Sequence, residues 1–85
     1  MRLVTFRVHK ENRLGILKNG KIIDLNSAYA LYLREVEGEK EPQRIADAFT
    51  PPDMKKFLEM GTKGVEAAKH VCEFLDIDEE IEGIH

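Results

Sequence analysis

The chain has 85 residues, of which 42% are hydrophobic and 34% charged, with one cysteine and a net charge of −3. This composition excludes a low-complexity or disordered chain, and a single domain of this size buries only about 60% of the surface of its unfolded state. The apolar runs of three or four residues are far shorter than the ~20 residues of a membrane helix, and no charged-then-apolar leader opens the chain. A single cysteine cannot form an internal disulfide. We therefore expect a small cytoplasmic protein that binds no membrane.

Charge is unevenly distributed along the chain. Residues 1–24 hold six Lys or Arg side chains against two Asp or Glu, whereas residues 25–85 are strongly acidic. The cations are spread along predicted strands, without an Arg cluster or a row of aromatic side chains for stacking bases. We therefore expect no nucleic-acid binding.

Apolar and polar residues alternate over residues 2–8, which is the period of a β-strand with one buried face. Val4, Phe6 and Val8 share the face that we expect to be buried, and Thr5 and Arg7 share the other.

Two further strands follow a polar turn at residues 9–12. Asn19-Gly20 separates the apolar runs 14–17 and 22–23, and Asn-Gly is the preferred pair for a type I′ hairpin turn. The first third of the chain is thus predicted to be a three-stranded antiparallel β-meander.

After Ile23, the apolar residues recur at helical spacing instead of alternating with polar ones. Asn26 is the expected N-cap of a first helix, with Leu25 before it as a hydrophobic staple onto Ala30 and Gly38 after its end. Pro42 suits the first turn of a second helix. The apolar positions of the two helices are Ala28, Leu31, Tyr32 and Val36, then Ile45, Ala46 and Phe49.

Two more short helices are predicted. Thr50 and Asp53 have the spacing of a capping box, with Pro51 at the first helical position. This third helix ends at Gly61, and Thr62 starts the fourth. The apolar residues are Met54, Phe57 and Leu58 in the third helix, and Val65, Ala68, Val71, Cys72 and Leu75 in the fourth. The predicted fold class is α+β, a small meander followed by about four short helices.

The domain is expected to span residues 1–75, and residues 76–85 read as an acidic linker or as the start of a further domain. This segment contains five carboxylates and no Lys or Arg. Its isoleucines Ile77, Ile81 and Ile84 have no evident partner in the chain.

Few residues suggest chemistry. His70 and Glu73 form an H-x-x-E pattern that places an imidazole and a carboxylate on one helix face, but two ligands do not complete a metal site, and a solvated helix face explains them as well. Glu80 and Glu82 would suit a hard cation only with further oxygen ligands. Cys72 lies on an apolar stripe and reads as a buried side chain rather than a nucleophile.

Nucleophilic catalysis is also unsupported, because Ser27 and Thr62 have no evident His and Asp partners. The glycines are scattered and form no phosphate-binding loop. No catalytic, cofactor-binding or metal-binding residue is assigned in this chain.

A family resemblance runs through nearly the whole chain. It rests on MRLVTFR (1–7), RLGIL (13–17), GKIIDLN (20–26) and AYA (28–30), followed by RIADAFTPPDM (44–54) and FLE (57–59). This series resembles the amino-terminal domain of fumarylacetoacetate hydrolase family proteins.

The resemblance implies a small non-catalytic domain ahead of a larger catalytic domain that this chain lacks. In that family the catalytic domain holds a divalent metal, usually Mg²⁺, and acts on 2-oxo acids or 1,3-dicarbonyl compounds by hydrolysis, isomerisation or decarboxylation. The family's own H-x-x-E lies in the catalytic domain, so its role does not transfer to His70 and Glu73.

The implied partner is the catalytic domain of the same protein or a second copy of the chain, with a homo-oligomer as one outcome. The alternative from another class is a stand-alone module that binds a protein partner through its helical face.

Overall fold

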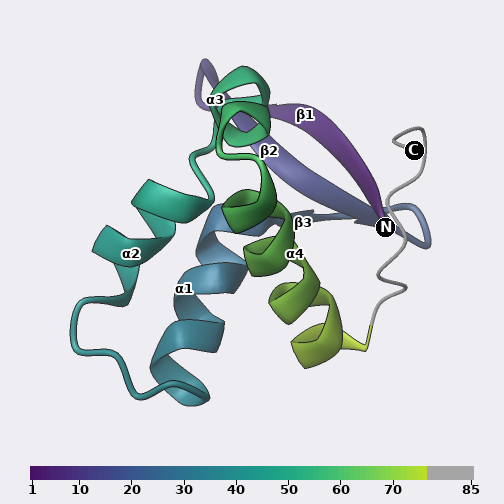
Figure 1. Cartoon of the computed structure of the whole chain (residues 1–85). Helices are drawn as coiled ribbons and strands as arrows, with labels where there is room; N and C mark the ends of the chain where they lie inside the picture. Colours follow the sequence, from purple (N-terminus) through teal and green to yellow (C-terminus); the bar gives the residue numbers. More distant parts are fainter. Residues whose placement is uncertain (77–85) are drawn as a thin grey trace.

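The computed structural model describes residues 1–76 and contains a three-stranded sheet followed by four helices (Figure 1). Strands β1 (Arg2–Val8), β2 (Glu11–Lys18) and β3 (Lys21–Asp24) pair antiparallel in the order β1-β2-β3. The helices are α1 (Leu25–Glu35), α2 (Pro42–Phe49), α3 (Met54–Glu59) and α4 (Thr62–Leu75). The predicted α+β class and the β-meander are confirmed.

Both hairpins turn through two residues with positive φ. Asn19 and Gly20 have φ of 51° and 77°, as predicted for a type I′ turn. His9 and Lys10 have φ of 50° and 66°, so the first hairpin uses the same kind of turn without a glycine. Because this turn needs only two residues, β2 begins at Glu11, within residues 9–12 that were predicted to form the turn.

The sheet has an inner face toward the helices and an outer face away from them. Leu14 and Ile16 on the inner face are 1% and 0% exposed. They pair with Thr5 and Leu3, and directly paired residues lie on one face. Val8, on the opposite face, is 40% exposed.

The prediction that Val4, Phe6 and Val8 form the buried face is therefore wrong. These side chains lie on the outer face, since strand alternation places them opposite the residues paired with Leu14 and Ile16.

Helix α1 follows β3 without a loop, and this moves its cap. Asp24, not Asn26, is the N-cap, and its carboxylate accepts a hydrogen bond from the backbone N–H of Ser27 at 3.3 Å. Asn26 lies inside the first turn and is only 3% exposed. The expected Asn26 cap is thus wrong because the helix starts one residue after the strand ends.

The capping box predicted at Thr50 and Asp53 is also wrong. Thr50 ends α2, and its hydroxyl donates to the carbonyl of Ala46 at 2.8 Å. Asp53 itself caps α3 by accepting from the backbone N–H of Lys55 at 2.9 Å. Pro51 therefore lies between the two helices instead of inside the third, whereas Pro42 opens α2 as expected.

Helix α4 starts at Thr62 as predicted and packs closely on α3. A Cβ at Gly64 would lie 3.1 Å from Phe57 Cε1 and 3.1 Å from Met60 Cβ, so the small residue allows this approach. The buried residues of α4 are Gly64, Ala67, Ala68, Val71 and Cys72. The core thus joins the inner sheet face to α1, α3 and α4, with Ala46 as the buried contribution of α2.

Candidate functional site

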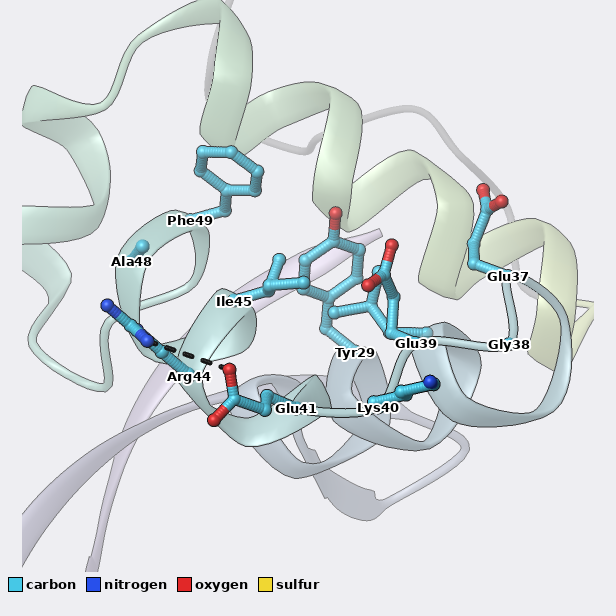
Figure 2. A pocket seen from close by; sticks show the side chains of 11 residues that line it. Tyr29, Glu37, Gly38, Glu39, Lys40, Glu41, Arg44, Ile45, Ala48 and Phe49 are labelled. Atoms are coloured by element: carbon cyan, nitrogen blue, oxygen red, sulfur yellow. Dashed lines mark ion pairs between the residues drawn. The ribbon is translucent and has the colours of Figure 1, made fainter.

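A hollow lies between α1, the loop at residues 36–41 and α2. It encloses about 990 Å³ and opens to solvent. Figure 2 shows Tyr29 and Ile45 within it, with charged side chains of the loop around them. Its apolar lining is Tyr29, Leu33, Ile45, Ala48 and Phe49, and its charged lining is Glu37, Glu39, Lys40, Glu41 and Arg44.

Backbone hydrogen bonds set the path of the loop. The N–H of Val36 donates to Tyr32 at 2.8 Å, and the N–H of Glu39 donates to Leu33 at 3.0 Å. Gly38 has a φ of 67° and lets the chain reverse between these two bonds. The loop therefore carries its carboxylates to the edge of the hollow.

Charged groups around the hollow are largely solvated. Arg44 and Glu41 approach to 3.6 Å, but their side chains are 81% and 72% exposed. An ion pair in this setting contributes little stability. These groups are thus available to a partner at little cost.

Beside the hollow, Tyr32 links α1 to the loop and to α4. Its hydroxyl donates to Glu37 Oε1 at 3.0 Å and lies 3.3 Å from His70 Nδ1. The rings of Tyr32 and His70 are stacked at 5.2 Å, and Tyr29 stacks on Tyr32 at 5.9 Å. Because the hydroxyl proton points to Glu37, its lone pair can accept from a protonated Nδ1 of His70.

The two tyrosines are held in their neutral form. Burial, followed by the hydrogen bond to Glu37, raises the pKa of Tyr32 above its ordinary value. Burial, followed by the charges of Glu37 and Glu39, raises the pKa of Tyr29. Both phenols are therefore hydrogen-bond donors near neutral pH, and neither is activated as a base.

The structure places His70 against Tyr32 rather than in a pair with Glu73. Both His70 and Glu73 are on the exposed side of α4. Within residues 1–76, no group of three His, Cys, Asp or Glu side chains is arranged to hold a metal ion. The H-x-x-E pattern thus contributes an aromatic contact through its histidine.

The other residues considered from sequence lie as follows. Cys72 is fully buried, with its Sγ 3.3 Å from Met1 Sδ, so the prediction that it packs in the core is confirmed. Ser27 and Thr62 are exposed at the starts of their helices. Glu80 and Glu82 lie outside the described residues.

Sequence reasoning missed a polar cluster that joins α1 to α2. Asn26 Nδ2 donates to the carbonyl of Thr50 at 3.0 Å and to Asp47 at 3.1 Å, and its Oδ1 accepts from Gln43 at 2.7 Å. Arg13 donates to Asp24 at 2.6 Å next to this cluster. The partners of Asn26 lie 13 residues before it, at Arg13, and 17 to 24 residues after it, so no local pattern marks them.

No family model matches the sequence, and neither a curated protein nor a solved structure is significantly similar to it. Over residues 1–76, every helix is too short or too polar to cross a membrane.

Proposed function

We propose that this chain is the non-catalytic amino-terminal domain of an enzyme of the fumarylacetoacetate hydrolase family. The observation that carries the proposal is the residue series of the resemblance, which extends from Met1 to Glu59 in one order. The catalytic domain that follows in such proteins would hold the Mg²⁺ or other divalent cation and the 2-oxo acid or 1,3-dicarbonyl substrate. The role of this chain is then to support that domain.

The hollow between α1 and α2 is the surface we assign to this contact. Its base is apolar, with Ile45 and Phe49 half-buried, and its edge carries exposed groups of both signs. An open hollow of this kind suits a projecting apolar side chain of a neighbouring domain, with polar contacts around it. The partner is accordingly the catalytic domain of the same protein.

Reading the coding sequence beyond His85 tests the proposal first. We expect the frame to continue into a strand-rich region with a second H-x-x-E and acidic residues downstream of it. A stop codon directly after His85 would contradict the proposal and favour the stand-alone interaction module.

The surface itself is tested by co-expressing this chain with the downstream region and measuring complex formation. Ala48 is exposed and lines the hollow, so Ala48→Glu is expected to weaken the complex at least tenfold. Leu31→Glu is the matched control, because Leu31 is 40% exposed on α1 and does not line this hollow. Equal losses for both variants would place the contact elsewhere.

Activity gives a separate readout. The chain alone is expected not to hydrolyse acylpyruvates in the presence of Mg²⁺ or Mn²⁺. Turnover at enzyme-like rates that disappears in His70→Ala would overturn the non-catalytic assignment.

A further inference from the structure

The outer face of the sheet carries an apolar patch that the helices leave uncovered. It consists of Val4, Phe6, Val8, Leu17 and Ile22, which the strand pairing places on one side. Val8 is 40% and Ile22 49% exposed. The buried core lies against the opposite face, so this patch is a second, separate apolar surface.

Gly15 makes the patch continuous. A Cβ at Gly15 would lie 2.6 Å from Ile22 Cγ2 and 2.9 Å from Phe6 Cε1. The side chains of Phe6 and Ile22 therefore extend over the glycine from both neighbouring strands. The result is a continuous apolar strip across the three strands, with Arg13 and Asp24 beside it on the same face.

Helix α4 ends at the end of the sheet where Leu17 and Ile22 lie. Asp76 adopts the left-handed conformation, with φ 55° and ψ 51°, and terminates the helix. Its carbonyl accepts a hydrogen bond from Lys18 Nζ at 2.9 Å. Lys18 is on the inner face, next to Leu17 at the β2–β3 turn, so the chain after Asp76 has to pass only the end of the sheet to reach the patch.

The composition of residues 77–85 complements this surface. The segment contains three isoleucines, Ile77, Ile81 and Ile84, together with four carboxylates and no Lys or Arg. At the same end of the sheet, Arg2 is exposed on the outer face, where it pairs with Leu17, and within residues 1–76 it makes no ion pair. The isoleucines thus match the apolar patch, and the carboxylates match the charge of Arg2.

The length of the segment is also sufficient. Nine residues span up to about 30 Å when extended, whereas the seven residues of β1 span roughly 23 Å. Residues 77–85 can therefore cross the whole patch from the position of Asp76.

We propose that residues 77–85 of the same chain bind the outer sheet face, with the isoleucines on Val4, Phe6 and Ile22 and the carboxylates toward Arg2. This contact gives the small sheet a second apolar layer. It does not depend on the family assignment, because it rests on the strand register and on the position of Asp76.

A nitroxide at position 82 of the full chain tests the proposal. Cys72 is fully buried, so a label directed to Glu82→Cys attaches to the new thiol. The methyl signals of Val4, Val8 and Ile22 are expected to broaden, while those of Leu33 and Ile45 in the helical layer do not. The same label at Arg34→Cys, on the exposed end of α1, is the matched control and should leave the outer-face methyl signals sharp.

A mixing experiment distinguishes binding by residues 77–85 of the same chain from binding by a second copy. A dilute sample labelled with both isotope and nitroxide in one chain is compared with a mixture in which the two labels are on different chains. Broadening in the first sample alone supports the proposal. Broadening in the mixture as well would assign the patch to a second copy, and sharp outer-face signals in both samples would show that residues 77–85 do not bind there; either result overturns the proposal.

Discussion

The two faces of the sheet are built from alternate residues of the same strands, yet they differ in what covers them. On the inner face, Leu14 and Ile16 are nearly inaccessible beneath the helices. On the outer face, Val8 and Ile22 expose 40% and 49% of their surface. Apolar character alone therefore does not decide which face of a small sheet becomes the core; the position of the helical layer does.

Replacing one isoleucine on each face gives the largest expected contrast. Ile16→Ala should lower the free energy of unfolding by about 2–5 kcal/mol, because it leaves a cavity in a fully buried site. Ile22→Ala should cost less, since half of that side chain is exposed. Urea titrations of the two variants measure the difference, and equal losses would contradict the assignment of the faces.

Combining Ile22→Ala with Ile81→Asp tests whether residues 77–85 contribute to the stability of the outer face. If residues 77–85 bind the outer face, Ile22→Ala costs more in the otherwise native chain than in the Ile81→Asp background. Leu31→Asp is the control background, because it places the same acid on exposed α1. A cost of Ile22→Ala that is the same in all three backgrounds would show that the two sites are independent.

The helical layer over the inner face depends on Asn26. Asn26→Ala removes the hydrogen bonds to Thr50 and Gln43 and leaves the buried carbonyl of Thr50 without this donor, so a loss of about 1–3 kcal/mol is expected. Ser27→Ala, at the exposed neighbouring position, should change stability by no more than about 0.5 kcal/mol. If both variants unfold at the same urea concentration, the cluster is not what fixes α1 on α2.

The Asn19-Gly20 turn keeps the two faces from exchanging, because a shift of one residue in the pairing of β2 and β3 would turn every side chain of β3 over. Gly20→Val should cost on the order of 1–2 kcal/mol, since a β-branched residue is strained at a φ of 77°. Gly20→Asn, which tolerates positive φ, should cost distinctly less. An unchanged melting temperature in Gly20→Val would place the turn elsewhere.

The smallest loss of stability is expected for a substitution of Tyr32, which links α1 to α4. The folded state raises the pKa of Tyr32, so the unfolded state loses the phenol proton first as the pH rises. The stability from this group is complete below the ordinary tyrosine pKa of about 10 and is lost as the pH rises through the raised value. Tyr32→Phe should cost about 1 kcal/mol near neutral pH and flatten the fall in melting temperature above about pH 10. If the melting temperature of Tyr32→Phe falls as steeply with pH as that of the native chain, other groups, Tyr29 among them, cause the fall.

Local signals predicted the elements well but not their ends or their faces. The period-2 pattern predicted the strand β1, Asn19-Gly20 predicted a turn and Pro42 predicted the start of α2, and the structure confirms these three elements. The Asn26 cap failed because α1 starts directly after β3, which gives the role to Asp24. The buried face was misassigned because Leu3 and Val4 are both apolar, and only the pairing with β2 distinguishes their sides.

The candidate surfaces were less accessible to sequence reasoning than the fold. The hollow needs α1, the loop at residues 36–41 and α2 in their final positions, and no local pattern in the sequence specifies these positions. The contact between Tyr32 and His70 joins residues that are 38 positions apart. Such contacts come from helix packing, which one sequence does not specify.

The proposal that residues 77–85 cover the face of the sheet opposite the helices is tested most directly by the access of a soluble paramagnetic agent to methyl groups. The full chain is compared with its Ile81→Asp variant at several protein concentrations. We expect Leu14 and Ile16 to be protected in both proteins, and Val4, Val8 and Ile22 to become markedly more accessible in the variant at every concentration. Outer-face methyl groups that are equally accessible in both proteins, or protected only at high concentration, would contradict the account.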